Sequence, residues 1–371
     1  MIPIALLTGF LGAGKTTVLN ALLRDPRFAH SAVLINEFGE TGIDGDLIVE
    51  FSADVIETTT GCLCCTASSD VRQSLFDLWL RRHKKEVPEF RRVLIETTGL
   101  ADPAPVIHAL TIPQSYGLMD KTVAGQFALA SVITTVDAIN APGSAAAYLE
   151  ALKQIALADA ILITKMELTP ARHREGRRDI LGEMIADTNP GAHVFEKQND
   201  WDRFVDWLLK NRTYERTART SEALAWLNAE AVLEHGPHAQ VHENESRHKD
   251  GIRAQCLIID EPISPIVFNF FMNALQASAG AALLRVKGLV ALDDDPTRPV
   301  VIHGVQHLVQ CVDRLAQWPS TDQRTRIVFI GQNIDIRAMK SILLTKTGKA
   351  KRAARSPVES KVIKETFHDD P

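Results

Sequence analysis

The hydrophobic pattern in the first half of the chain consists of short apolar runs separated by longer, mixed segments. The runs are rich in β-branched residues and apolar at consecutive positions; they span residues 4–7, 32–35, 93–95, 131–136 and 160–164. Continuous apolarity over strand length is typical of parallel strands covered on both faces, with helices in the intervening segments. The pattern predicts a doubly wound α/β domain with a mostly parallel sheet over residues 1–200.

The second half of the chain has a different pattern. Residues 201–251 begin as a helical pattern and become polar and rich in histidine, which we interpret as a linker. Beyond it, apolar runs resume at residues 254–259, 283–286, 299–302 and 327–330. These runs predict a smaller α+β domain over residues 252–345. The remaining residues, 346–371, are basic and poor in apolar side chains, and we expect a disordered, solvated tail.

One helix of the second domain is predicted in detail. Ser264 is a favourable N-cap residue, and Pro265 after it suits the first helical position. Phe268, Phe271 and Leu275 follow at helical spacing and would share one face. The sequence therefore predicts an amphipathic helix that begins at Pro265.

Composition and charge narrow the possible functions. The 371 residues are 45% hydrophobic and 23% charged, as in ordinary globular proteins, and the length suggests two or three domains. A net charge of −5 argues against a surface built for nucleic acid or anionic membrane. No apolar stretch approaches the roughly 20 residues of a membrane helix, and no secretory pattern opens the sequence. We expect a cytoplasmic protein with neither nucleic acid nor membrane as a partner.

A phosphate-binding motif follows the first predicted strand. Residues 9–17 read GFLGAGKTT, which fits G-x-x-x-x-G-K-[ST] between a strand and a helix. In such loops, backbone N–H groups surround the phosphates, the lysine reaches the β- and γ-oxygens, and the hydroxyl after it binds Mg²⁺. We predict nucleotide contacts at seven residues, with Lys15 also catalytic: Gly9, Gly12, Ala13, Gly14, Lys15, Thr16 and Thr17.

A second predicted strand ends in an acidic residue, within the sequence Glu96-Thr97-Thr98-Gly99. The carboxyl ends of the strands form the ligand-binding edge of a doubly wound sheet. We predict that Glu96 orients Mg²⁺ or its water and that the Gly99 N–H faces the γ-phosphate, so that both residues are catalytic. Taken alone, Glu96 could equally be a buried capping residue.

The strand over residues 160–164 ends in the sequence Thr164-Lys165-Met166-Glu167, which is similar to the guanine-reading sequence N-K-x-D. Lys165 can cover the plane of the base, and the carboxylate of Glu167 can accept from the two N–H donors that guanine has and adenine lacks. Threonine in place of asparagine and glutamate in place of aspartate leave the choice between GTP and ATP open.

Three of the five cysteines lie together in the sequence Cys62-Leu63-Cys64-Cys65. Thiolates suit Zn²⁺ or Co²⁺. One short segment cannot readily close a tetrahedral shell, so the fourth ligand must come from elsewhere; Glu40 is our candidate, with water or a partner protein as alternatives. Buried core cysteines or a redox pair would also explain the cluster.

Histidines supply two weaker candidates. Those of the linker, at positions 235, 238, 242 and 248, fit either a metal-collecting arm or a solvated polar segment, and their spacing does not decide between the two. His303, His307 and Cys311 stand at four-residue steps and would share one face of a helix. We interpret this second set as structural, because a core or surface histidine is the commoner case.

Together the motifs resemble those of the CobW-type metallochaperone GTPases, a class of P-loop GTPases that also contains the urease and hydrogenase nickel-insertion proteins. The resemblance rests on residues 9–17, 36–40 (NEFGE), 61–65 (GCLCC), 96–103 (ETTGLADP) and 164–165, and on LRVKG at 284–288 and VFIG at 328–331. It covers about residues 2–345 and leaves the tail outside.

The resemblance implies a set of site residues. Phosphate binding is implied at Gly12 through Thr17, with Mg²⁺ at Thr16 and Glu96 nearby. Glu37 and Glu40 fall in what that family uses as a first switch, and Glu167 stands where the family usually has an aspartate that contacts guanine. The transferred metal is implied at the three clustered cysteines, Cys62, Cys64 and Cys65.

The implied activity is slow hydrolysis of GTP to GDP, coupled to delivery of zinc, or next cobalt, to a client metalloprotein. An open three-thiolate site is consistent with a dimer or a client that supplies the last ligand, and we expect a monomer or a homodimer that depends on nucleotide or metal. Two other classes share the phosphate loop: a P-loop phosphotransferase or kinase, and a nucleotide-regulated metal-buffering protein that does not hydrolyse. The cysteine cluster fits neither as well.

Overall fold

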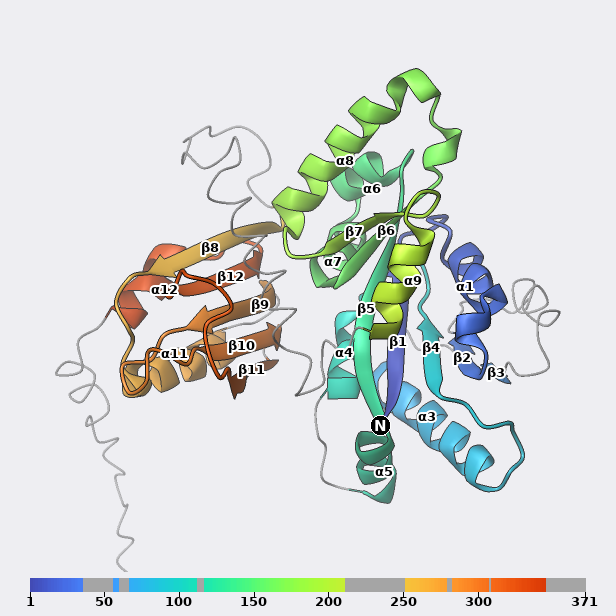
Figure 1. The fold of residues 1–371 in the computed structure, drawn as a ribbon, viewed down its shortest axis with the longest axis horizontal. Coiled ribbons are helices and arrows are strands. Elements are labelled where there is room, and N and C mark those ends of the chain that lie inside the picture. The colour runs from blue at the N-terminus through green and yellow to red at the C-terminus, as the bar shows by residue number, and fades with distance from the viewer. Residues whose placement is uncertain are drawn as a thin grey trace, which may run out of the picture.

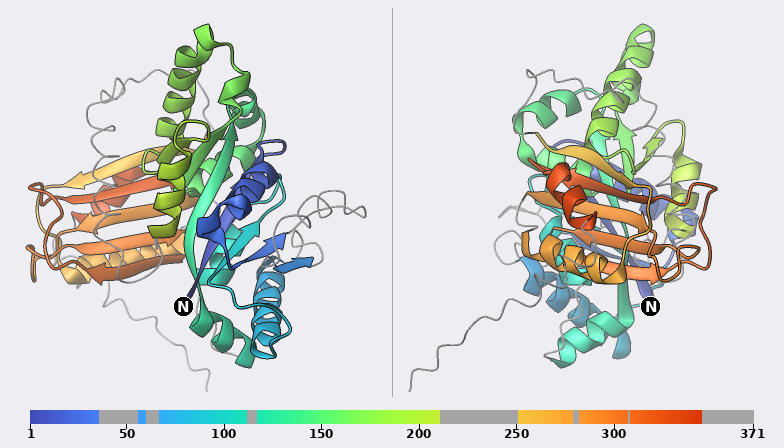
Figure 2. Two further views of the ribbon diagram at one scale, coloured as in Figure 1. Left: turned by 45° about the vertical axis from the view of Figure 1, so that its right-hand side comes forward. Right: turned by 90° about the vertical axis from the view of Figure 1, so that its left-hand side faces the viewer.

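The computed structural model describes residues 1–35, 56–59, 67–111, 117–210, 251–278, 282–306 and 308–344. Within these ranges the chain forms two sheets that lie side by side, each with its own helices (Figures 1 and 2). Residues 2–196 form the first sheet and residues 253–331 the second. No helix in the described ranges is long and apolar enough to cross a membrane.

The first sheet is parallel throughout and carries the candidate site. Its strands are β1 (Ile2–Gly9), β2 (Ser31–Ile35), β3 (Ile56–Thr59), β4 (Arg92–Glu96), β5 (Phe127–Asp137), β6 (Ala160–Thr164) and β7 (His193–Glu196). Their order in the sheet is β3-β2-β4-β1-β5-β6-β7, and each neighbouring pair is parallel. This arrangement confirms the doubly wound α/β fold.

Helices cover both faces of this sheet (Figure 1). The α-helices are α1 (Lys15–Arg24), α3 (Ala67–His83), α4 (Ala104–Thr111), α5 (Leu118–Gln126), α6 (Ala141–Ala147), α7 (Leu149–Leu157), α8 (Arg174–Thr188) and α9 (Trp201–Lys210). Three short 3₁₀ helices are η1 (Pro26–Phe28), η2 (Met166–Leu168) and η3 (Ala171–His173). Buried side chains of α1 and α9 pack on one face, and those of α3, α4, α5 and α7 pack on the other. The runs are therefore apolar on both sides because both faces are buried.

The second sheet is antiparallel. Its strands are β8 (Arg253–Ile259), β9 (Leu283–Val290), β10 (Val300–Val305), β11 (Leu308–Arg314) and β12 (Thr325–Gly331), in the order β11-β10-β9-β12-β8. Helices α11 (Pro265–Ser278) and α12 (Ile336–Leu343) pack on one face. The other face adds Leu284, Val305 and Val328 to the core formed by α3, α4 and α7, so the two sheets share one continuous apolar core. The predicted α+β character of this region is confirmed.

The helix predicted in this second unit begins at Pro265, as expected, and Phe268, Phe271 and Leu275 are buried on one face. Three edge strands were not predicted: β3, β7 and β11 are short or polar, and at a sheet edge the apolar signal is weak. Residues 211–250 of the predicted linker and 346–371 of the predicted tail lie outside the described residues.

The helical spacing assigned to His303, His307 and Cys311 is wrong. His303 lies in β10 and Cys311 in β11, two antiparallel strands of which Ile302 and Cys311 are register partners. The physical reason is visible in the sequence around them, because it is rich in β-branched residues, at positions 300, 301, 302, 305, 309 and 312, which favour strands. His307 lies outside the described residues.

Candidate nucleotide-binding site

The phosphate loop connects β1 to α1 at the carboxyl edge of the parallel sheet. Gly9, Gly12 and Gly14 have φ values of 147°, 70° and 84°, which residues with side chains rarely adopt. A Cβ atom at Gly9 would lie 2.2 Å from the Thr135 side-chain oxygen on β5. The loop can therefore approach its neighbouring strand only because this residue is glycine.

Lys15 is the first residue of α1 and is only 8% exposed. Its Nζ donates to the main-chain oxygens of Gly9, at 3.0 Å, and Phe10, at 3.3 Å. These bonds hold the ammonium group against the loop, at the N-terminus of a helix where anions are favoured. Thr17, the last residue predicted to contact nucleotide, is exposed in the first turn of the same helix.

Thr16 of helix α1 and Glu96 of strand β4 come together at the carboxyl edge of the sheet. The Thr16 hydroxyl donates to Glu96 Oε1 at 2.9 Å, and Glu96, the last residue of β4, is 6% exposed. Register pairing of Glu96 with Leu7 and a hydrogen bond from the Thr97 hydroxyl to the Thr8 hydroxyl fix this strand end beside β1. A hydroxyl and a carboxylate are the oxygen donors that Mg²⁺ prefers, so this pair fits a magnesium ion.

The end of β6 fastens the phosphate loop from the opposite side. The Thr164 hydroxyl donates to Ala13 O at 2.8 Å, and Lys165 Nζ donates to Gly12 O at 2.6 Å. Lys165 itself has φ 60°, in the left-handed region. The threonine that replaces asparagine in the N-K-x-D pattern thus has a clear structural partner. Glu167 is exposed in η2, and its contact with guanine stays a prediction.

Asp137, at the end of β5, supports Lys165 and was not among the predicted residues. Lys165 Nζ lies 2.8 Å from Asp137 Oδ2, and the N–H groups of Ile139 and Asn140 donate to Oδ1. Burial favours a higher pKa for Asp137, but hydrogen bonds from the Lys165 side chain, the Ile139 N–H and Asn140 outweigh burial and lower the pKa. The signal for this residue was its position, because it ends a buried strand at the same edge as Glu96.

Replacing Asp137 by asparagine is expected to destabilise the protein by about 1–3 kcal/mol at neutral pH, because a charged hydrogen bond to Lys165 is lost. A carboxyl group whose folded pKa is lowered stabilises the fold above its unfolded pKa, near the ordinary value of 3.8. The contribution disappears as the pH falls through the lower folded pKa. Urea unfolding of wild type and Asp137→Asn should therefore show a constant gap between pH 5 and 8 that narrows below about pH 4. The exposed Asp77→Asn is the control, and a gap of the same size at all pH values would contradict the assignment.

Gly99 lies directly against the phosphate loop. A Cβ atom at this position would be 2.6 Å from Leu11 Cδ2 and 2.8 Å from Leu11 Cα, which is backbone and cannot rotate away. The segment after β4 and the loop therefore touch, as expected if Gly99 faces the phosphates.

Replacing Gly99 by alanine is expected to push the loop out of position and to lower nucleotide hydrolysis about 10- to 100-fold, since small displacements of reacting groups have effects of this size. Gly176→Ala is the matched control, because nothing lies within 4 Å of the new methyl group on α8. Steady-state hydrolysis rates measure the effect, and equal rates for the two variants would show that the contact with Leu11 has no role in turnover.

The predicted metal ligands Cys62, Cys64, Cys65 and Glu40, together with Glu37, lie outside the described residues. Their neighbours are described. β3 ends at Thr59, at the carboxyl edge of the sheet that also carries the phosphate loop, and α3 begins at Ala67. Elsewhere in the described ranges, no three His, Cys, Asp or Glu side chains are placed to hold one metal ion.

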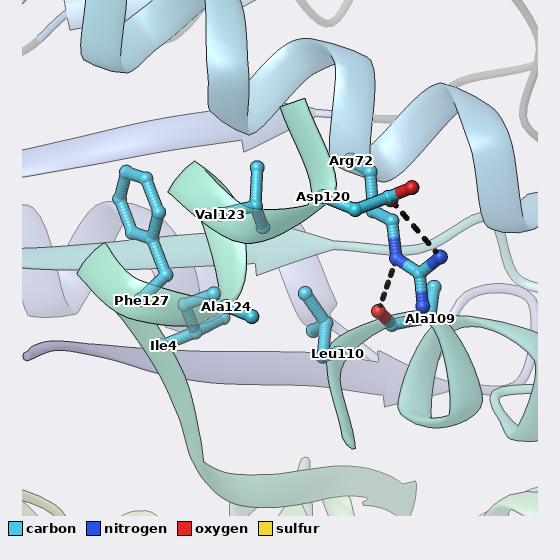
Figure 3. A pocket seen from close by; sticks show the side chains of 8 residues that line it. All are labelled: Ile4, Arg72, Ala109, Leu110, Asp120, Val123, Ala124 and Phe127. Carbon is cyan, nitrogen blue, oxygen red and sulfur yellow. Dashed lines mark hydrogen bonds and ion pairs between the residues drawn. The ribbon is translucent and has the colours of Figure 1, made fainter. Parts of the chain in front are cut away.

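Helix α3, which follows the cysteine segment, is anchored by a buried arginine. Arg72 Nε donates to Ala109 O of α4 at 2.7 Å, and Nη1 lies 3.3 Å from Asp120 Oδ1 of α5 (Figure 3). The cavity beside these residues has a volume of about 10 Å³, which is room for one water molecule. Arg72 therefore links three helices, and the cavity beside it is too small for a ligand larger than water.

The second histidine candidate is also structural. His303 in β10 is half-buried, and desolvation of its ring lowers its pKa well below the usual value, with Lys287 and Arg285 acting in the same direction. The imidazole is therefore neutral at physiological pH.

Comparison with known proteins agrees with this geometry. Residues 3–196 match the CobW/HypB/UreG nucleotide-binding domain, and residues 252–345 match the cobalamin synthesis protein CobW C-terminal domain. The chain is 30% identical over 331 residues to the zinc chaperone YjiA of Escherichia coli (strain K12), covering 89% of this chain and 94% of the relative. It is 28% identical over 389 residues to the zinc chaperone CobW of Pseudomonas aeruginosa, covering 93% and 91%.

A solved structure agrees over both sheets. The crystal structure of Zn(II)-bound YjiA GTPase from E. coli aligns with a TM-score of 0.65 at 25% identity, covering 92% of this chain and 97% of that one. Sequence family, relatives and fold thus point the same way: the chain belongs to the CobW/HypB/UreG family of P-loop nucleotide-binding proteins, in the branch that carries a CobW C-terminal domain.

Proposed function

We propose that this protein is a metallochaperone that binds and slowly hydrolyses GTP and delivers zinc to a client metalloprotein. The observation that carries the proposal is the phosphate loop held between Glu96 on one side and Thr164 and Lys165 on the other. Relatives described as zinc chaperones and a Zn(II)-bound GTPase of similar fold support the choice of nucleotide and metal.

Each residue of the loop has a role in this proposal. The N–H groups from Gly12 to Thr17 bind the phosphates, and Lys15 neutralises the β- and γ-oxygens. The Thr16 hydroxyl would hold Mg²⁺, Glu96 would orient the ion or its water, and the ion would supply charge neutralisation at the phosphates. The Gly99 N–H faces the γ-phosphate, and the contact between Gly99 and Leu11 supports this placement.

The base is recognised at the end of β6. Lys165, fixed by Asp137 and Gly12 O, covers the plane of guanine, and the exposed Glu167 carboxylate accepts from its N1 and N2 donors. The longer side chain of glutamate reaches from η2, which begins directly after Lys165.

Zinc is the cargo and is bound by Cys62, Cys64 and Cys65, with Glu40 as the fourth ligand; cobalt suits the same thiolates. β3, the strand before this segment, ends at the nucleotide edge of the sheet, and α3 is the next described helix. GTP therefore favours a tight-binding arrangement, and hydrolysis in the presence of the client releases the ion. By linkage, zinc must change GTP affinity by the same factor that GTP changes zinc affinity.

The test is competitive Zn²⁺ affinity of the full-length protein with Mg²⁺ and a non-hydrolysable GTP analogue, compared with Mg²⁺ and GDP. The expected difference is about 5- to 150-fold, the usual range of such coupling, and it should vanish in Cys64→Ala. Cys256→Ala, which removes a cysteine of β8 outside the cluster, is the matched control and should retain the difference. Equal zinc affinity in the two nucleotide states would overturn the coupling. Absence of zinc binding would reduce the protein to a nucleotidase.

A further inference from the structure

The segment after β4 is held by two neighbouring side chains of α7. Gln154 Nε2 donates to Gly99 O at 3.2 Å and to Ala101 O at 3.0 Å, and Gln154 is fully buried. Lys153 Nζ donates to Asp102 Oδ2 at 2.8 Å. Three successive anchor points, at residues 99, 101 and 102, are therefore attached to one turn of one helix.

Hydrogen bonds position both the backbone and the side chain of Gln154. The main-chain oxygen of Gln154 accepts from the Thr134 hydroxyl of β5 at 2.7 Å, which fixes this turn of α7 to the sheet. Because Nε2 donates to two carbonyl oxygens, the orientation of the side-chain amide is set: only its NH₂ end can donate. Losing this side chain would leave the buried carbonyl of Gly99 and the half-buried carbonyl of Ala101 without this donor.

The other end of α7 is held by the C-terminal domain. Arg285 of β9 is 2% exposed, and its Nη1 donates to Leu157 O at 2.7 Å and Ala158 O at 2.8 Å. Its Nη2 pairs with the buried carboxylate of Asp159, which also accepts from Val132 N at 2.8 Å. A cation on the last carbonyls of a helix satisfies acceptors that have no intrahelical partner and complements the helix dipole.

A second contact reaches the same segment from the other side. Asp102 Oδ1 accepts from Ala104 N at the start of α4 at 2.9 Å. Near the end of α4, His108 Nε2 lies 3.0 Å from Val305 O of β10. Residues 99–102 are thus attached to α7 and α4, and each of these two helices contacts the C-terminal sheet.

We infer that Lys153 and Gln154 are positioning residues for the segment of Gly99, and that the C-terminal domain controls this segment through Arg285 and α7. This inference rests on the proposed function, because it assigns the segment a role at the γ-phosphate. The phosphate loop has further bonds that do not involve α7, from Lys15, Thr164 and Lys165. Docking of the C-terminal domain therefore affects the rate of GTP hydrolysis more than GTP affinity.

Two changes test the link. Gln154→Leu removes the amide and keeps an apolar side chain that is one bond shorter. Arg285→Met combined with Asp159→Asn removes the two most buried charges together, because removing only one would leave its partner buried alone and could prevent folding. Lys287, whose Nζ lies 3.8 Å from Asp159 Oδ1, keeps its charge in this variant and is 12% exposed. Arg326→Met is the matched control, since Arg326 is a buried arginine of the same sheet that pairs with Asp322 of its own domain.

Both changes are expected to speed amide hydrogen exchange over residues 97–103 in the nucleotide-free, full-length protein. They are also expected to lower kcat for GTP about tenfold with KM within about twofold, the signature of positioning rather than binding. The combined variant should have a kcat no lower than that of Gln154→Leu alone, because both changes act through one helix. Lys153→Ala should lower kcat in the same way, and Lys153→Arg should restore it.

The inference is overturned if the charge-removed variant keeps wild-type exchange over residues 97–103, or if its effect on kcat multiplies with that of Gln154→Leu. It is also overturned if Arg326→Met has the same effect, since the cause would then be general destabilisation of the sheet. If the wild-type protein hydrolyses no GTP, the proposed function fails, whereas the exchange measurement still decides whether α7 links the two regions.

Discussion

Replacing Lys15 by alanine is expected to weaken GTP binding by about 100-fold or more and to abolish measurable hydrolysis. The ammonium group is nearly buried at the N-terminus of α1, where it would meet the β- and γ-oxygens. Each hydrogen bond to a charged group contributes about 1.5–3 kcal/mol, and Lys15 is expected to make two. Such a loss corresponds to about a 100- to 10,000-fold change in dissociation constant.

Titration with a fluorescent GTP analogue, and phosphate release at saturating GTP, measure the two effects. Lys15→Arg keeps the charge but not the compact shape, so it should recover part of the affinity and little of the turnover. Lys84→Ala is the control, because Lys84 is exposed after the end of α3. Alanine at position 15 also removes bonds to Gly9 O and Phe10 O, so unfolding curves of both variants are needed. Retention of GTP affinity in a folded Lys15→Ala protein would contradict the site.

Much of the fold could be predicted from the sequence, because burial of both faces leaves a strong apolar pattern. The central strands β1, β4, β5 and β6 were all found this way, as was the helix beginning at Pro265. The edge strand β7 was missed, since its sequence His-Val-Phe-Glu is short and half polar. The four-residue spacing of His303 and His307 suggests a helix, although the β-branched run at residues 300–302 indicates the strand that is found.

The candidate site also contains residues that the sequence predicts and contacts that it does not. Gly9, Lys15, Thr16 and Glu96 belong to local motifs, and the fold brings them together at one edge of the sheet. Other contacts depend on residues far apart in sequence. Thr164 bonds to a carbonyl 151 positions away, and Arg285 bonds to one 128 positions away. No local pattern encodes such pairs, because their partners are main-chain oxygens that any residue supplies.

Replacing Glu96 by glutamine is expected to separate function from stability. The amide keeps an oxygen that can accept from the Thr16 hydroxyl, but the negative charge that attracts Mg²⁺ is gone. Hydrolysis should fall about 100-fold, as when one preorganised group of a reaction site is lost, and the Mg²⁺ concentration needed for half-maximal rate should rise. GTP affinity measured without Mg²⁺ should change little, since Lys15 and the loop N–H groups remain.

The unfolding free energy without Mg²⁺ decides between the two interpretations of this residue. Glu96 is 6% exposed, and burying a carboxylate lowers the stability of the fold unless the charge is paired, hydrogen-bonded or bound to a metal ion. If it is a magnesium-orienting group, Glu96→Gln is at least as stable as wild type, because a desolvated charge has been removed. A structural cap would behave in the opposite way: the glutamine variant would be less stable, and its hydrolysis would keep the wild-type dependence on Mg²⁺.

Glu89→Gln is the control for the loss of one carboxylate, because the Glu89 side chain is exposed. Stability and magnesium dependence move in opposite directions under the two interpretations, so measuring both on one variant distinguishes them even if hydrolysis falls in each case.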